Sequence, residues 1–154
     1  MNEKEVLQTC QGWCSQREHC IAELNEKLAK YDLTDSTKES ITKQLLDDGY
    51  IDEQRYARCF ARDKARFNGW GPRKIRFHLS VKRINSEAID NAIAEIDPEI
   101  FEDSLERALT SRMKGADKKD RQRLKAALLR LGESRGFEYD NIFRITDKLL
   151  KADS

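Results

Sequence analysis

Arginines recur at helical spacing in the most informative stretch of this sequence, which begins at Gly49. Arg55, Arg58, Arg62 and Arg66 are separated by three or four residues, which would align four guanidinium groups along one helix face. Such a face suits a polyanion or an acidic protein groove. We take these and neighbouring cations, with one tryptophan, as candidate contacts to a partner or to DNA: Arg55, Arg58, Arg62, Arg66, Trp70, Arg73, Lys74, Arg76, Lys82, Lys118, Lys119, Arg121 and Lys125.

A helix is needed to present that stripe, and its sequence signals are present. Asp52 is placed to accept hydrogen bonds from the free backbone N–H groups of a helix start. Tyr56, Ala57, Phe60 and Phe67 recur at helical spacing and are expected to face a core. The segment therefore predicts a helix that packs with one side and offers positive charge with the other.

Composition predicts an all-helical protein. The 154 residues allow one compact domain or a short run of small units. With 37% charged and 38% hydrophobic residues, an elongated or modular form is favoured over a single thick core. Two prolines and seven glycines suit helices. No apolar run is long enough for a transmembrane helix and the start does not resemble a signal peptide, so we expect a cytoplasmic protein.

Charge is sorted into blocks along the chain, although the net charge is only +1. Residues 52–83 carry ten bases against three acids, a net +7. Residues 86–106 carry eight acids and no base, and residues 107–135 again carry ten bases against three acids. Solvated helix faces explain many charges but not this sorting, which favours a binding role for the basic blocks.

The cysteines and histidines indicate neither a metal site nor a catalytic site. Cys10, Cys14 and Cys20 lie near His19, but their spacing matches no common zinc pattern. We expect them, with Cys59, to be reduced cysteines that act as small apolar residues. No nucleophile arrangement accompanies His78, so we expect no enzyme activity, no catalytic residue and no cofactor.

Signals for the start and end of helices predict nine helices, at 3–14, 16–30, 36–48, 52–67, 72–83, 86–95, 98–113, 118–134 and 138–151. Capping boxes are expected at Ser15-Gln16-Arg17-Glu18 and Ser36-Thr37-Lys38-Glu39, and Gly71-Pro72 and Asp97-Pro98 place proline at first helical positions. The helices group into three sets of three.

A faint repeat of roughly 50 residues supports that grouping. Apolar residues recur at equivalent places in the three sets, namely Leu33, Ile84 and Phe137, then Leu24, Ile75 and Leu128, then Ile41, Ile93 and Ile145. A fourth set, Leu28, Leu79 and Gly132, departs at the glycine. We therefore predict an all-α, elongated array of three tandem three-helix repeats with boundaries 1–50, 51–96 and 97–154; three unrelated helical hairpins are the alternative.

Motifs in the middle and near the end of the sequence resemble those of a known family. Gly49-Tyr50-Ile51-Asp52-Glu53-Gln54-Arg55-Tyr56-Ala57, Phe60-Ala61-Arg62 and Gly71-Pro72-Arg73-Lys74-Ile75 with Leu79 are similar to the central signature of the RecX family. Residues 136–142 resemble its C-terminal repeat. The resemblance implies a regulator of the RecA recombinase that binds in the groove of the RecA–single-stranded DNA filament and limits its extension, strand exchange and co-protease activity. It also implies three tandem three-helix repeats and action without a cofactor. We expect the protein to be a monomer.

Two positions depart from the family pattern. Arg83 stands where the family often has glycine, and a left-handed conformation there would cost roughly 1 kcal/mol. Gly132 is expected to thin the packing of the third set.

Three other interpretations stay open. A helical protein could bind DNA without RecA, using the basic faces of the second and third repeats and stacking Trp70 on a base. Trp70 could instead pack the turn between two helices. Direct DNA binding should weaken steeply with salt, whereas a binder of the protein filament should show a shallower dependence. A purely structural scaffold leaves the charge blocks unexplained.

Overall fold

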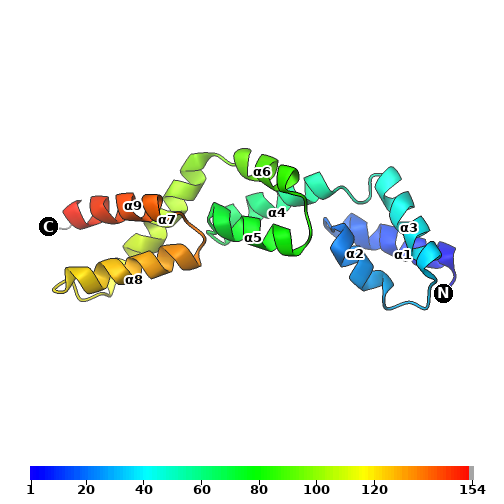
Figure 1. Ribbon diagram of the computed structural model, residues 1–154, viewed down its shortest axis with the longest axis horizontal. Helices are drawn as coiled ribbons and strands as arrows, with labels where there is room; N and C mark the ends of the chain where they lie inside the picture. The colour runs from blue at the N-terminus through cyan, green and yellow to red at the C-terminus, as the bar shows by residue number, and fades with distance from the viewer. Residues whose placement is uncertain (153–154) are drawn as a thin grey trace. The chain divides into compact units, whose positions relative to one another are not determined.

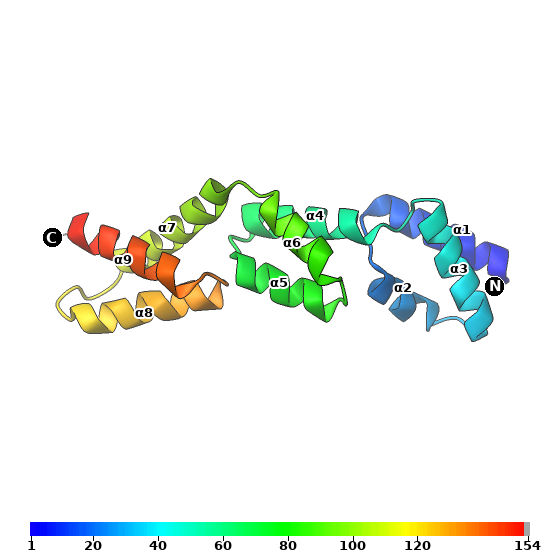
Figure 2. The same ribbon diagram turned by 45° about the horizontal axis from the view of Figure 1, so that its top comes forward.

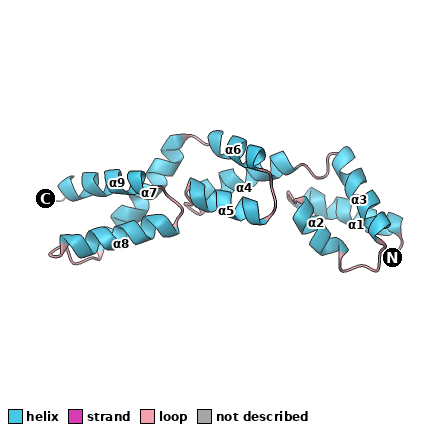
Figure 3. Cartoon of the chain, viewed as in Figure 1, coloured by secondary structure: helices cyan, strands magenta, loops and turns pink. Residues whose placement is uncertain are grey.

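The computed structural model describes residues 1–152, which form nine helices and no strand (Figures 1 and 3). The all-α prediction is confirmed. The helices are α1 (Glu3–Gln16), α2 (Ile21–Leu28), α3 (Asp35–Asp47), α4 (Glu53–Phe67), α5 (Pro72–Val81), α6 (Ser86–Ala94), α7 (Pro98–Lys114), α8 (Arg121–Ser134) and α9 (Tyr139–Ala152). Within the described residues, no helix has the length and apolar character needed to cross a membrane.

Both predicted capping boxes are wrong, because other residues start these helices. Ser15 lies inside α1, where its hydroxyl donates to the Gln11 carbonyl, so α2 begins at Ile21 rather than at 16. Glu23 accepts a hydrogen bond from the Cys20 N–H at the start of α2. The cap of α3 is Thr34, whose hydroxyl oxygen accepts from the Thr37 N–H at 3.1 Å. The start of α8 also shifts, from the predicted 118 to Arg121, where Asp120 is the cap.

Residue contacts divide the chain into two compact units. The first comprises residues 1–59 and 79–92, and the second comprises 60–78 and the chain from 93 onward, so residues of α4, α5 and α6 enter both. In the first unit, α1 and α2 both pack on α3 over a core of Val6, Cys10, Leu24, Leu28, Ile41, Leu45 and Ile51. The predicted repeat boundaries at 50/51 and 96/97 stay a prediction.

In the second unit, α7, α8 and α9 pack against one another (Figure 2). Their core is formed by Leu105, Leu109, Met113, Leu124, Leu128, Phe137, Ile142, Ile145 and Leu150. We had expected Gly132 to thin this packing, and that expectation is wrong. A Cβ at Gly132 would lie 2.6 Å from the Ile142 side chain, so the isoleucine already fills the space that a larger residue would need.

The residues of the sequence repeat are predominantly buried. Leu24, Ile75 and Leu128 have no exposed surface. Most of the remaining apolar members are also buried, the exceptions being the half-buried Leu33 and Ile93. The weak periodicity of the sequence therefore marks residues that face helical cores in each of the three sets.

Two glycine turns of the second unit are in direct contact. The Gly71 N–H donates to the Arg135 carbonyl at 2.6 Å, and the Arg73 N–H donates to the Gly136 carbonyl at 2.9 Å. A Cβ on Gly71 would lie 2.5 Å from the Gly136 carbonyl oxygen, and one on Gly136 would lie 2.5 Å from the Lys74 nitrogen. Gly136 also has a φ of 93°, which favours glycine. The contact joins the start of α5 to the turn between α8 and α9.

Arg83 adopts the left-handed conformation that its position suggested. Its φ is 61°, and among the described residues it is the only one other than glycine with a positive φ. The Ile84 N–H donates to the Leu79 carbonyl at 3.1 Å and so closes the end of α5. This is a helix ending that normally uses glycine.

Candidate functional site

Helix α4 carries the predicted arginine stripe, and its start is built as expected. Asp52 accepts a hydrogen bond from the Arg55 N–H at 3.0 Å. Tyr56 and Ala57 are buried, and Ala61 and Ala65 continue the buried side. Phe67 was assigned to this core and is 81% exposed, so that assignment is wrong. Successive buried positions advance by four residues, and a residue two beyond Ala65 points to nearly the opposite side of the helix.

Arg55 is held by contacts within its own unit. Its Nε donates to both carboxylate oxygens of Glu18, at 2.7 and 2.5 Å, and its NH2 group donates to the Gly49 carbonyl at 2.9 Å. The hydrogen bond to Glu18 is the main reason that the pKa of Arg55 is raised. Arg55 therefore ties α4 to the segments before α2 and before α4.

The other three arginines of α4 are exposed. Arg58, Arg62 and Arg66 lie along the helix with exposed side chains. Arg62 lies 3.5 Å from the carboxylate of its neighbour Asp63, and both groups are more than half exposed. Exposed pairs of this kind contribute little, so Arg62 can exchange its carboxylate for another anion at small cost.

Trp70 packs in the turn between α4 and α5. The Nζ atoms of Lys64 and Lys74 lie 4.9 and 4.6 Å from the centre of its ring, and the ring of His78 is 4.6 Å away. Partial burial, followed by the two lysine charges, lowers the pKa of His78. With cations and an imidazole so close to its ring, this placement favours packing of the turn over base stacking.

The remaining candidates lie on several elements of the two units. Arg73 is half exposed and lies 4.0 Å from Glu138, and the Lys82 Nζ lies 3.8 Å from Glu23. Arg76 is exposed on α5. The last four, all exposed, lie just before and within the first turns of α8: Lys118, Lys119, Arg121 and Lys125.

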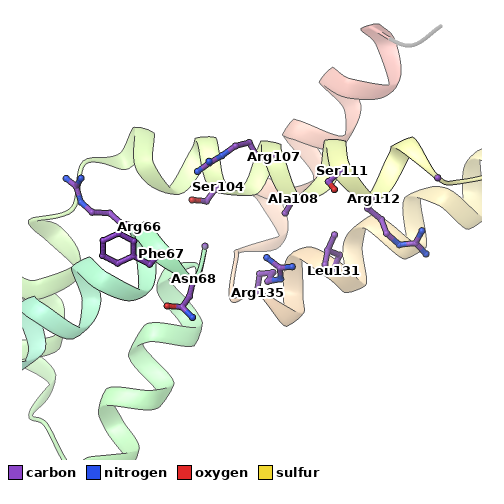
Figure 4. Close-up of a pocket in the computed structure, with 12 residues that line it drawn as sticks. Arg66, Phe67, Asn68, Ser104, Arg107, Ala108, Ser111, Arg112, Leu131 and Arg135 are labelled. Atoms are coloured by element: carbon purple, nitrogen blue, oxygen red, sulfur yellow. The ribbon is translucent and has the colours of Figure 1, made fainter.

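Sequence reasoning missed a cleft in the second unit, with a volume of about 680 Å³ (Figure 4). We call it the arginine cleft, and it is lined by Arg66, Phe67, Asn68, Gly69, Ser104, Arg107, Ala108, Ser111, Arg112, Gly115, Leu131 and Arg135. Four of these side chains are guanidinium groups, and no carboxylate lines the cleft. Only Arg66 had been selected from the sequence. The other three belong to the basic block 107–135, which was the available signal, but only the packing of α7 and α8 shows that they share a cleft with Arg66.

The N-terminal cysteines and His19 belong to the core of the first unit. The His19 ring is buried and stacks on Trp13 with centroids 3.5 Å apart, and its Nδ1 lies 3.2 Å from Glu23. Burial raises the pKa of Cys10 and Cys20, and raises that of Cys14 to about 11. Across residues 1–152, no cluster of three or more His, Cys, Asp or Glu side chains is placed to hold a metal ion.

Glu53 carries a polar atom with no partner in the described part of the chain. Its Oε2 is buried without a hydrogen bond. The carboxylate nevertheless accepts one hydrogen bond, from the backbone of Ile21 at the start of α2. Burial is the main reason that the pKa of Glu53 is raised. The carboxylate thus helps to begin α2 at the cost of partial desolvation.

The fold and these surfaces define an all-helical protein of three-helix sets, with exposed arginines on α4 and an arginine cleft in the second unit. The family described as RecX, second three-helix domain, matches residues 52–93. The regulatory protein RecX of Vibrio parahaemolyticus serotype O3:K6 (strain RIMD 2210633) is 32% identical over 128 residues, covering 83% of this chain and 81% of that protein. The chain belongs to the RecX family.

Further relatives agree with this assignment. The regulatory protein RecX of Vibrio campbellii (strain ATCC BAA-1116) is 34% identical over the same shares of the two chains. A crystal structure of regulatory protein RecX matches with a TM-score of 0.85 at 21% identity, covering 94% of this chain and 73% of that one. The crystal structure of RecX from Lactobacillus salivarius matches with a TM-score of 0.80 at 20% identity, covering 96% of each chain. The relatives are named as regulatory proteins, in agreement with the prediction of a role without catalysis.

Proposed function

We propose that this protein regulates the RecA recombinase by binding the RecA–single-stranded DNA filament and inhibiting its ATPase, strand-exchange and co-protease activities. The observation that carries the proposal is membership of the RecX family over 83% of the chain. The protein acts as a monomer in the cytoplasm and needs no cofactor. Binding in the filament groove is likewise proposed from the family resemblance.

The exposed arginines of α4 are the proposed contact. Arg58, Arg62 and Arg66 present their side chains to solvent, so they can pair with acidic RecA surface or with DNA phosphate. Arg55 is assigned a bracing role instead, because its guanidinium group already pairs with Glu18. The acidic block 86–106 faces away from the filament or contacts basic elements of RecA.

A RecA-dependent ATPase assay on single-stranded DNA, with and without the protein at two salt concentrations, tests the proposal. The doubly substituted Arg58→Glu, Arg62→Glu protein should lose inhibition while keeping its helicity. The matched control, Lys30→Glu with Lys43→Glu, makes the same change in net charge on exposed residues of the first unit and should inhibit normally. Full inhibition by the arginine variant would remove the α4 face from the contact, and no effect of the unaltered protein on RecA would end the proposal.

A second function, DNA binding without RecA through basic faces of the second and third repeats, is favoured by the arginine cleft. Its four guanidinium groups have no carboxylate among the lining residues to neutralise them. The two functions predict different salt dependence, because direct binding releases counterions in proportion to the phosphates neutralised. A steep loss of DNA affinity with salt in the absence of RecA supports the second function, and DNA affinity that is undetectable at low salt excludes it.

A further inference from the structure

Positive charge in the arginine cleft comes from three segments of the second unit. Arg66 lies at the end of α4, Arg107 and Arg112 lie on α7, and Arg135 follows α8 (Figure 4). Within residues 1–152, none of these four guanidinium groups engages a carboxylate in an ion pair. Four positive charges lining one cleft favour a ligand with several negative charges. The planar fork of arginine matches phosphate oxygens in a bidentate manner.

An exposed aromatic ring at the same cleft narrows the choice of ligand. Phe67 is 81% exposed and its ring lies beside Arg66, with Asn68 next to it (Figure 4). A bare phenylalanine ring provides a stacking surface for a base, and such stacking tolerates any base because each has a π face. The Asn68 amide and the hydroxyl groups of Ser104 and Ser111 add donors and acceptors that could reach a sugar or a base edge.

The cleft also has a suitable size. Its volume of about 680 Å³ falls within the range of roughly 300–1,000 Å³ that is usual for small-molecule sites. An acidic peptide would satisfy the arginines, but it would leave the exposed ring without a planar partner. The combination of arginines, hydroxyl groups and one exposed ring is therefore better matched to a ligand that joins phosphate to an aromatic base.

We infer that the arginine cleft binds a nucleotide, with the phosphates held by its arginines and the base stacked on Phe67. The nucleotide comes either from a single-stranded nucleic acid or from a free nucleoside triphosphate, which share this chemistry. The inference deepens the second proposed function, DNA binding without RecA, by naming the ligand chemistry of the cleft, and it does not rest on the proposed filament regulation.

Fluorescence anisotropy of the 154-residue chain, without RecA, tests the inference with four probes. These are a labelled single-stranded oligothymidylate, an abasic strand of equal length, a labelled nucleoside triphosphate, and an acidic peptide of equal charge. Arg107→Gln with Arg112→Gln removes two cleft charges from exposed positions on α7. Arg123→Gln with Arg130→Gln is the matched control, because it removes two exposed arginines of α8 that do not line the cleft.

The cleft variant should bind the strand or the triphosphate about tenfold or more weakly than the control variant does. Its slope of log affinity against log salt on the strand should fall by about 1.4, since each phosphate on a single strand contributes about 0.7. Phe67→Leu should weaken the oligothymidylate by about fivefold or more and leave the abasic strand unchanged. Competition between strand and triphosphate then identifies which source of nucleotide the cleft prefers, and either result supports the inference.

Three patterns of binding would overturn the inference. They are equal weakening by the cleft and control variants, equal binding of normal and abasic strands, and tighter binding of the acidic peptide than of any nucleotide. Absence of binding to all four probes would overturn it as well. The RecA assay gives a separate answer: a protein that binds nucleotide but leaves RecA unaffected contradicts only the filament proposal.

Discussion

Replacing Gly71 by alanine tests the contact between the two glycine turns. The added Cβ would lie 2.5 Å from the Gly136 carbonyl oxygen, 2.7 Å from its carbon and 2.8 Å from Cδ1 of Phe137. Two of these atoms are backbone atoms, which cannot turn aside as a flexible side chain can. The start of α5 and the turn before α9 must therefore move apart for the variant to fold.

The expected cost follows from what that movement breaks. The Gly71 and Arg73 N–H groups each donate across the contact, and a hydrogen bond of this kind contributes about 1 kcal/mol net. Phe137, which is 2% exposed, also loses part of its packing. We expect Gly71→Ala to lower the free energy of unfolding by about 2–4 kcal/mol, a large part of the stability of a small protein.

Urea unfolding and amide hydrogen exchange measure this cost together. Gly12→Ala is the matched control, because Gly12 lies inside α1 with open space around its Cβ position. Alanine there should stabilise the protein by about 0.5–1 kcal/mol, since glycine is a poor helix residue. If Gly71→Ala proves as harmless as the control and the Gly71 and Arg73 amides stay protected, the contact does not hold these turns together.

Three further predictions follow from single residues. Arg83→Gly should raise the free energy of unfolding by up to about 1 kcal/mol in urea titrations, because it relieves a left-handed arginine; a loss of stability would contradict this. Because the folded pKa of Glu53 is raised, folding should weaken as pH rises through the window between the ordinary glutamate pKa and that raised value, and Glu53→Gln should flatten this change in thermal unfolding. Cys14, with its pKa near 11 against 9.0 for an ordinary thiol, should alkylate about 100-fold more slowly at pH 8 than in urea-unfolded protein, as peptide mass spectrometry would show. Equal rates would mean that burial does not protect it.

The helices were predictable because their signals are local. Asp52, Pro72 and Pro98 each stand at a helix start, and the periodicity of leucine and isoleucine identified most of the buried faces. The start of α2 was missed because Glu23 accepts from the N–H of Cys20, a residue that is not among the common caps. Phe67 was wrongly assigned to the core because it is an aromatic residue. Its position two residues beyond Ala65 places it on nearly the opposite side of the helix from the buried residues.

The candidate site was less predictable, since it depends on residues far apart in the chain. Helical spacing placed Arg55 with the other arginines of α4, but it could not show that Glu18, 37 positions earlier, would engage it. The count of charges along the sequence identified the basic block that contains Arg107 and Arg135. It could not show that these residues share a cleft with Arg66, because that depends on how α7 and α8 pack. Gly71 was assigned only to a helix start, whereas its lack of a side chain is what admits the Gly136 turn.

The contact between the glycine turns also limits how the chain can be divided for experiments. Fragments that end at residue 96, the predicted boundary of the third repeat, would lose the carbonyl groups of Arg135 and Gly136. The Gly71 and Arg73 amides would then have to find water or another acceptor at the start of α5. Loss of activity in such a fragment would therefore report damage to the remaining helices as well as removal of the third repeat, so substitutions are the safer way to map function on this protein.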